Sequence, residues 1–358
     1  MGLFIGLMSG TSMDGVDAAL VDLNTNRCIS GITRPYGEEA WHFLEKILQG
    51  SPLNLGTLNQ LNTLLGREFG FAVLELLKKA NCSAKEIIAI GSHGQTICHD
   101  AFAEIPYTVQ LACPHTIAQM TGIRVVADFR TRDMVVGGQG APFAPLYHQV
   151  LFTQSPIMIV NIGGIANVTF LESSQPPRGY DVGPGNCLMD AWIREIKNQP
   201  YDADGAWAGQ GQVIESLLST LSSDPFFQRK PPKSIGKEYF SLDWLKLNLQ
   251  KDYASADIQA TLLELTAIMI AKTIPLQIRN VVICGGGVHN LALLRALQRK
   301  AGKAKIVSST EFGVDPDFIE AMMFAWLADK TIREIPVDLS ALTGAKQPVI
   351  LGAVYPYG

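Results

Sequence analysis

Short apolar runs and amphipathic stretches alternate along most of this chain. Apolar side chains recur at helical spacing between residues 56 and 80, which predicts a helix there. Continuous apolar runs at 157–160 and 281–284 predict buried strands, and each of them is followed by a glycine-rich segment. Because strands alternate with helices through most of the sequence, the expected fold class is α/β.

Polar and small residues predict how these elements are connected. Residues 3–23 predict a hairpin of two strands around a turn of glycines and hydroxyls. Residues 129–140 predict a polar, glycine-rich loop, which suits a functional site better than a core. Asn186 is expected to cap one helix, and Asp315 followed by Pro316 is expected to open another.

The composition describes an ordinary globular protein with room for two domains, which we expect at residues 1–150 and 151–358. Of its 358 residues 47% are apolar and 17% are charged, and the net charge of −4 gives no general attraction to nucleic acid or to acidic membranes. No apolar run is long enough for a membrane span, and a signal peptide is not expected. The six cysteines are scattered without CxxC pairs, which favours reduced thiols in the cytosol.

Three glycine-rich segments, at residues 5–17, 161–164 and 285–287, follow predicted strands. Backbone N–H groups can crowd around an anion in such turns, so together they favour a phosphate-bearing ligand. The chain lacks the GxxxxGK[ST] pattern, and its glycine spacing does not fit the dinucleotide fingerprint. The alternative is that these glycines only form tight turns.

Two other groups of polar residues have plainer interpretations. His93, Cys98 and His99 lack a fourth ligand at a recognisable spacing, so no metal site of protein ligands is predicted. A basic segment with Lys233 and Lys237 is expected to be a solvated surface, and the alternative is contact with phosphate or substrate.

Several longer motifs resemble those of the anhydro-N-acetylmuramic acid kinase family. They occur in the same order from residue 5 to about 352 and comprise IGLMSGTSMDGVD (5–17), GSHGQT (91–96), VADFR (126–130), GGQGAP (137–142), NIGG (161–164), DVGPGN (181–186), DGAW (204–207), CGGG (284–287), TG (343–344) and LGA (351–353). Several of these strings are long and rare, so agreement by chance is implausible.

The resemblance implies a two-domain ATP-binding fold, with two actin-like, ribonuclease H-like lobes flanking a nucleotide cleft. It implies an ATP-dependent and magnesium-dependent kinase of amino-sugar catabolism in peptidoglycan recycling. Such an enzyme opens 1,6-anhydro-N-acetylmuramic acid with water and phosphorylates O6, giving N-acetylmuramate 6-phosphate and ADP. A cytoplasmic homodimer is implied as well.

The residues expected to bind the nucleotide lie in the three glycine-rich segments, and Asp14 or Asp17 is expected near a magnesium ion. The full set is Gly10, Thr11, Ser12, Met13, Asp14, Gly15, Val16, Asp17, Asn161, Gly163, Gly164, Gly285, Gly286 and Gly287.

Water is a poor nucleophile, so the reaction needs a carboxylate base. Asp181 matches the position of the family's catalytic aspartate, and Asp190 is a weaker candidate. A guanidinium suits the lactyl carboxylate of a muramic acid; Arg130 matches the family's sugar contact, with Arg132 as its competitor.

Two further residues are expected to contact the sugar. Thr96 offers a hydroxyl by family match, although a hydrogen bond to the backbone would explain it as well, and Glu320 is a candidate on the helix predicted to start at Asp315. Two other functions stay open at this point: another sugar or carboxylate kinase of the same superfamily, and an ATP-binding module without sugar chemistry.

Overall fold

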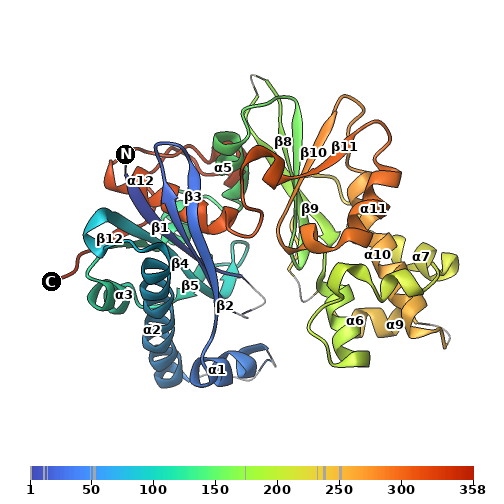
Figure 1. The fold of residues 1–358 in the computed structure, drawn as a ribbon, viewed down its shortest axis with the longest axis horizontal. Helices are drawn as coiled ribbons and strands as arrows, with labels where there is room; N and C mark the ends of the chain where they lie inside the picture. The colour runs from blue at the N-terminus through green and yellow to red at the C-terminus, as the bar shows by residue number, and fades with distance from the viewer. Residues whose placement is uncertain are drawn as a thin grey trace. The chain divides into compact units, whose positions relative to one another are not determined.

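The computed structural model of the chain describes residues 2–10, 13, 15–48, 50, 54–173, 175–231, 233–236, 239–249 and 252–358. Thr11, Ser12 and Asp14, which were predicted to bind the nucleotide, lie outside these residues. The chain forms two compact units: unit 1 contains residues 1–151 and 318–358, and unit 2 contains residues 152–317 (Figure 1). The sequence predicted one lobe for 151–358, whereas the structure returns 318–358 to the first unit.

Unit 1 is built on a seven-stranded mixed sheet with the order β12-β6-β4-β1-β2-β3, in which β5 pairs with β4. Its strands are β1 (Leu3–Ser9), β2 (Gly15–Asp22), β3 (Arg27–Pro35), β4 (Ile87–Asp100), β5 (Tyr107–Leu111), β6 (Val125–Ala127) and β12 (Ala353–Tyr355). Its helices, including the 3-10 turn η1, are α1 (Glu38–Leu48), α2 (Leu55–Ala80), η1 (Ala84–Glu86), α3 (Pro114–Thr121), α4 (Phe129–Val135), α5 (Ala144–Leu151), α12 (Ile319–Ile332) and α13 (Ser340–Thr343).

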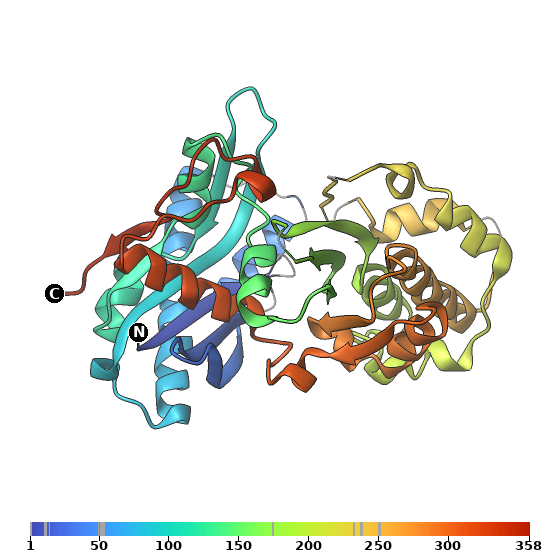
Figure 2. The ribbon, with the colours of Figure 1, turned by 90° about the horizontal axis from the view of Figure 1, so that it is seen from above.

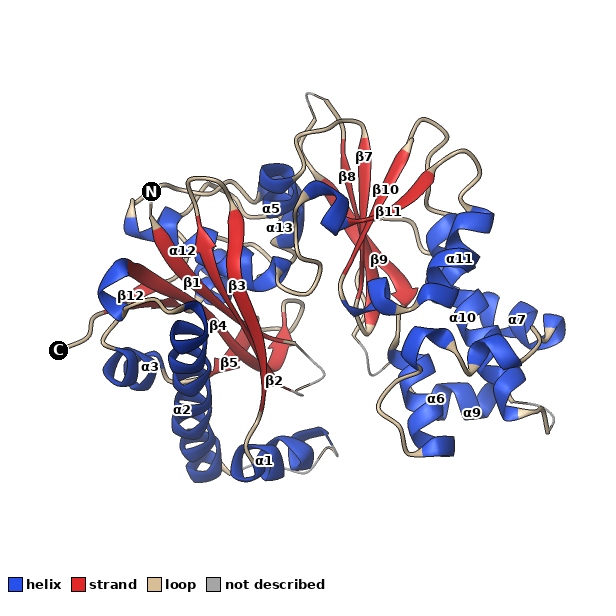
Figure 3. Ribbon diagram, viewed as in Figure 1, coloured by secondary structure: helices blue, strands red, loops and turns tan. Residues whose placement is uncertain are grey.

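Unit 2 is built on a five-stranded sheet with the order β11-β10-β7-β8-β9. Its strands are β7 (Ile157–Ile162), β8 (Ile165–Leu171), β9 (Arg178–Pro184), β10 (Asn280–Cys284) and β11 (Lys305–Ser308). Its helices and 3-10 turns are α6 (Cys187–Lys197), η2 (Ala203–Gly205), η3 (Ala208–Gln210), α7 (Glu215–Ser222), α8 (Pro225–Gln228), α9 (Leu242–Asn248), α10 (Ser255–Ala271), η4 (Gly286–His289), α11 (Leu291–Lys300) and η5 (Ser309–Phe312) (Figure 3).

The two sheets share one topology. In unit 1, β1, β2 and β3 form an antiparallel meander, and β4 and then β6 add in parallel on the other side of β1. In unit 2, β7, β8 and β9 form the meander, and β10 and β11 add in parallel beside β7. If the paired strands of each unit are counted along the chain, with β6 as the fifth strand of unit 1, both sheets contain the order 3-2-1-4-5 that defines the ribonuclease H-like fold. The expected α/β fold class is confirmed.

Helix α12 explains why the end of the chain belongs to unit 1. It packs on β1 and β4, and Figure 2 shows it (red) beside the N-terminal strands (blue). A Cβ atom on Gly6 would lie 1.7 Å from the carbonyl oxygen of Ala321, and one on Gly91 would lie 2.0 Å from that of Phe324. Only glycine allows so close an approach of helix and strand backbones, so these two glycines serve the packing.

Most elements predicted from the pattern are confirmed, including the first hairpin, the long helix α2 and the strands β7 and β10. Two predictions are wrong. Residues 129–135 form the helix α4 instead of a loop, and α12 begins at Ile319 instead of Asp315. The Asp315 carboxylate accepts the Asp317 amide in a short turn, at 3.1 Å, and the Pro316 carbonyl accepts the Gly285 amide, so the predicted start signal is used for a turn. Among the described residues, no helix is long and apolar enough to cross a membrane.

Candidate functional site

The turn between β7 and β8 is held by its carbonyl groups. The Gly163 carbonyl accepts the Asn186 amide at 2.8 Å, and the Gly164 carbonyl accepts the amides of Gly185 and Cys187 at 2.9 and 3.1 Å. The Ile162 carbonyl accepts the side-chain amide of Asn186 at 3.2 Å. Three successive carbonyls of the turn therefore point towards the start of α6.

The amides of this turn consequently face the other way. In a trans peptide the N–H group points opposite to the C=O group, so the N–H groups of Gly163, Gly164 and Ile165 are directed away from α6. A Cβ atom on Gly163 would have nothing nearer than 3.7 Å, and one on Gly164 nothing nearer than 3.8 Å. Packing therefore does not require glycine here, and successive amides that face open space are typical of an anion site.

The glycines at the end of β10 have two different roles. Gly285 has a φ of +74°, and its Cβ would lie 2.3 Å from Asn161 Oδ1, while a Cβ on Gly287 would lie 2.4 Å from Ile162 Cγ2. These two allow the backbone to pack against the end of β7. Gly286 is open, since its nearest neighbour would be the Asn186 side-chain nitrogen at 3.9 Å.

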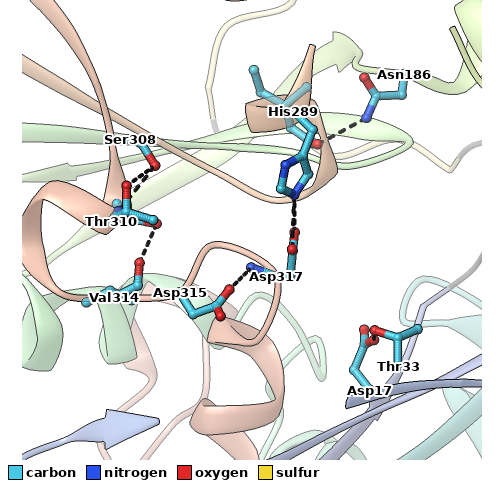
Figure 4. A network of polar contacts seen from close by, with 11 residues as sticks. Asp17, Thr33, Asn186, His289, Ser308, Thr310, Val314, Asp315 and Asp317 are labelled. Carbon is cyan, nitrogen blue, oxygen red and sulfur yellow. Dashed lines mark hydrogen bonds and ion pairs between the residues drawn. The ribbon is translucent and has the colours of Figure 1, made fainter. Parts of the chain in front are cut away.

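Asn186 thus links two of the predicted nucleotide-binding segments. It precedes α6 and makes no side-chain cap bond, and its side-chain nitrogen donates to the Ile162 carbonyl (Figure 4). The same nitrogen borders Gly286. Asn186 therefore occupies the predicted N-cap position of α6, but its side chain holds the carbonyl side of the β7–β8 turn and makes no cap bond.

Asp181 lies on β9, the strand that pairs with β8 and ends just before α6. Its Oδ2 accepts the Ile235 amide at 2.9 Å, and burial, partly opposed by that bond and by Lys233, raises its pKa to about 6. A carboxylate with a pKa near 6 is largely ionised at pH 7 yet basic enough to take a proton. Asp181 precedes Gly185 by four positions, roughly 13 Å along a strand.

The basic segment after α8 is not simply a solvated surface. The Lys233 ammonium donates to the Phe226 carbonyl at 3.2 Å and lies over the Phe226 ring at 4.5 Å. Burial lowers the pKa of Lys233, with Arg229 acting in the same direction and Asp181 against it. Lys237 lies outside the described residues. The structure therefore gives Lys233 a place beside the candidate base that its sequence context did not indicate.

In unit 1, side-chain hydrogen bonds hold the backbone of the first glycine-rich turn. The Ser9 hydroxyl donates to the Gly15 carbonyl at 2.6 Å and accepts the Tyr36 hydroxyl at 2.9 Å, while the Gln95 side chain donates to the Gly10 carbonyl at 3.0 Å. Ser9 is 1% exposed. It therefore braces the turn and is not among the groups that face a ligand.

Other residues of the first turn offer backbone more than side chain. The side chains of Met13 and Val16 are buried, and Met13 has a φ of 58°, in the left-handed region. Asp17 accepts the Thr33 hydroxyl at 2.6 Å (Figure 4). Carboxylate oxygen is a ligand that Mg²⁺ prefers, so Asp17 fits the predicted magnesium role in its chemistry.

Arg130 is fixed by two hydrogen bonds at the start of α4. Its Nε donates to His93 Nε2 at 2.8 Å, and its Nη1 donates to the Gly140 carbonyl at 3.0 Å. Within the described part of the chain, Nη2 has no hydrogen-bond partner. The guanidinium therefore presents one edge to a ligand, and a planar fork of this kind suits a carboxylate.

His93 is held in one tautomer by its neighbours. Its Nδ1 lies 2.8 Å from the Gly94 carbonyl and must donate, so Nε2 is left to accept from Arg130. Burial and the Arg130 guanidinium keep the pKa of His93 well below its usual value. Because both ring nitrogens are engaged, His93 is not available as a metal ligand.

Glu320 and Thr96 complete the predicted sugar residues. Glu320 interacts electrostatically with Arg130, which opposes the increase in its pKa that burial causes. The Thr96 hydroxyl accepts the Gln110 side-chain amide at 3.3 Å. Arg132 is exposed, and no hydrogen bond to it occurs among the described residues. The structure thus brings Arg130, His93 and Glu320 together, while no contact joins Thr96 to them within the described residues.

Sequence reasoning missed two polar groups. Asp133 is fully buried and accepts the Gly140 amide at 2.7 Å and the Thr343 hydroxyl at 2.9 Å, which fixes the carbonyl that Arg130 uses. His289 pairs with Asp317 at 2.9 Å at the end of the Gly285–Gly287 segment (Figure 4). The loop and the TG motif were a signal for Asp133, whereas nothing in the sequence pattern pointed to His289.

These features define a two-unit α/β protein of the ribonuclease H-like class, with a candidate phosphate site and a half-buried acid in unit 2. The family model for anhydro-N-acetylmuramic acid kinase matches residues 2–357, and the chain belongs to this family. The anhydro-N-acetylmuramic acid kinase of Legionella pneumophila (strain Corby) is 57% identical over 361 residues, covering 99% of each chain. That of Coxiella burnetii (strain Dugway 5J108-111) is 44% identical over 360 residues, covering 98% of this chain and 97% of the relative.

A distant likeness to a solved structure was also found. The activator of the 2-hydroxyisocaproyl-CoA dehydratase from Clostridium difficile with bound ADPNP is 15% identical, with a TM-score of 0.48, and the match covers 93% of this chain and 96% of that one.

Proposed function

We propose that this protein is a kinase that uses ATP and water to convert 1,6-anhydro-N-acetylmuramic acid into N-acetylmuramate 6-phosphate and ADP. Membership of the family supports the proposal, because relatives that match nearly the whole chain carry this name. The observation that carries it is Asp181, a carboxylate with a pKa raised to about 6, on the strand that pairs with β8 beside the amide-lined turn.

The reaction balances without a further reactant. The oxygen of water bonds to the anomeric carbon C1 as the C1–O6 bond breaks, and O6 takes the γ-phosphoryl group of ATP, so ADP leaves. The proton of the attacking water goes to Asp181, which is ionised before the step. Alignment and charge stabilisation supply most of the remaining rate enhancement, as is usual in phosphoryl transfer.

Each unit contributes groups of a different kind. In unit 2, the amides of Gly163 and Gly164 are proposed to bind phosphate oxygens, and the open face of Gly286 is proposed to admit the nucleoside. In unit 1, the free edge of Arg130 is proposed to bind the lactyl carboxylate, with Glu320 beside it.

Two further side chains are proposed to bind the magnesium ion and the sugar. Asp17 is proposed as a ligand of the magnesium ion that accompanies ATP, where the metal would neutralise phosphate charge. Thr96 is proposed to donate a hydrogen bond to the sugar. Homodimerisation and a cytoplasmic location stay predictions from the sequence.

Product analysis tests the proposal. The protein is incubated with 1,6-anhydro-N-acetylmuramic acid, ATP and Mg²⁺, and the products are followed by ³¹P NMR and by a reducing-sugar assay. The anhydro sugar is non-reducing, so equal amounts of ADP and of a reducing 6-phosphosugar are expected. The Asp181→Asn variant is the control, with turnover reduced roughly a thousandfold or more.

Two outcomes would contradict the proposal. Phosphorylation of an ordinary hexose or of acetate, without reaction of the anhydro sugar, would indicate another kinase of the superfamily. Slow ATP turnover that no sugar changes would indicate an ATP-binding module.

A further inference from the structure

A short segment of backbone, residues 233–236, runs along β9 and holds Asp181. Strand β9 is the edge of the unit 2 sheet, so its outer hydrogen-bonding groups are free to pair. The Asp181 amide donates to the Lys233 carbonyl at 3.0 Å, and the Ile235 amide donates to Asp181 Oδ2 at 2.9 Å. Both the backbone and the side chain of Asp181 are therefore bonded to this segment, which we name the β9 strap.

The strap fixes which carboxylate oxygen can accept a proton. Oδ2 is engaged by the Ile235 amide. Among the residues that the structure describes, Oδ1 has no hydrogen-bond partner. Because the carboxyl group is held from one side, Oδ1 is the oxygen left for the attacking water.

The Lys233 side chain is held by Phe226. Its ammonium donates to the Phe226 carbonyl at 3.2 Å and lies 4.5 Å from the centre of the Phe226 ring. Phe226 is fully buried and packs edge-on against Phe240, with ring centres 5.8 Å apart. The positive charge is therefore held on an aromatic support instead of moving freely in solvent.

This charge acts on the candidate base. Lys233 lowers the pKa of Asp181 against the larger effect of burial, and Asp181 in turn favours the charged form of Lys233. Arg229, at the end of α8, acts on Lys233. On β9 itself the neighbouring titratable groups are Arg178 and Tyr180, and the register partner on β8 is the neutral Asn167.

We propose that Lys233 is a positioning residue for the reaction: its strap orients the Asp181 carboxyl group, and its ammonium keeps that group ionised so that Oδ1 can take the proton of water. The inference rests on the proposed role of Asp181 as the base. It assigns a function to a lysine that the sequence indicated only as part of a solvated basic segment.

The experiment compares Lys233→Met with Lys233→Arg and with Lys230→Met. Methionine keeps a flexible side chain on the Phe226 ring without the charge. The strap's two bonds to Asp181 involve the backbone carbonyl of residue 233 and the backbone amide of Ile235, and so survive the change. Lys230 is an exposed lysine of the same basic segment and serves as the matched control. The readouts are the acidic limb of the kcat–pH profile and the titration of Asp181 by ¹³C NMR of labelled aspartate, assigned with Asp181→Asn.

Lys233→Met is expected to move both the acidic limb and the Asp181 titration to higher pH, by about one unit, because an opposite charge has been removed. Lys233→Arg and Lys230→Met are expected to titrate like the wild type. An Asp181 titration that stays in place or falls in Lys233→Met would overturn the proposal. The NMR titration does not depend on turnover, so it decides the role of Lys233 even if the proposed reaction is not found, and the product assay decides the reaction separately.

Discussion

Replacing Asp181 with asparagine is expected to stabilise the protein while removing its activity. The carboxyl group has a pKa of about 6 in the folded chain, against an ordinary value of 3.8. Between these values the unfolded chain ionises while the folded chain keeps its proton. The folded state therefore loses stability as the pH rises from about 4 to about 6, and the loss is complete above that range.

The size of the effect follows from the shift in pKa. At about 1.36 kcal/mol per unit, ionising Asp181 in the folded state costs about 3 kcal/mol at pH 7.5 and about 1.5 kcal/mol at pH 5. Asparagine does not ionise, and its side-chain oxygen can still accept the Ile235 amide. The variant should gain these amounts in free energy of unfolding relative to the wild type.

Urea unfolding of the full chain at pH 5 and pH 7.5, followed by tryptophan fluorescence, measures the gain. Asp252→Asn is the control, because Asp252 is an exposed carboxylate of the same unit and should change stability by less than about 0.5 kcal/mol. The reasoning is refuted if Asp181→Asn is no more stable than the wild type at pH 7.5. An equal gain at both pH values would show that asparagine acts through packing and not through charge.

Three further predictions concern glycine positions and the arginine fork. Gly163→Ala should fold with near-normal stability but weaken ATP binding at least about tenfold in calorimetry, because its methyl group enters the space in front of the amides. Gly185→Ala should lose about 1–3 kcal/mol in urea unfolding, because its Cβ would lie 2.3 Å from a carbonyl oxygen. Arg130→Lys should raise the KM for the anhydro sugar about 10- to 100-fold, since the fork loses its two fixed bonds, while Arg132→Lys should leave KM unchanged; equal effects would contradict the assignment. Gly6→Ala should cost about 3 kcal/mol or more in urea unfolding, and a stable variant would show that the helix on β1 can shift.

The order of elements could be read from the sequence because their signals are local. The helix α2 and the strands β7 and β10 follow directly from the spacing of apolar residues. The return of residues 318–358 to unit 1 could not, because it depends on helix α12 fitting against two glycines far away in the chain. The start of α12 was misplaced for a related reason: the turn at Asp315 bonds to Gly285, a contact no local pattern encodes.

In the candidate site, too, local sequence signals identify some residues, while contacts between distant residues are visible only in the structure. Family motifs led to Arg130 and Asp181, but the motifs do not say how either side chain is held. The proposal of Arg130 in place of Arg132 depends on contacts that the sequence does not show, because two arginines in one turn of sequence differ here only in their partners. The sequence predicted only a solvated surface for Lys233, because its proposed positioning role depends on an aromatic ring and a carboxyl group that are brought together by tertiary folding.

The discontinuity of unit 1 has a consequence for biosynthesis. A ribosome releases residues 152–317 as one uninterrupted stretch, so unit 2 can complete its fold while the chain is still being made. The N-terminal sheet emerges earlier but lacks the helix that covers β1 and β4 until the last part of the chain has left the exit tunnel. The half that is translated first is therefore the half that matures last, and its uncovered strands are where a nascent-chain chaperone would be needed.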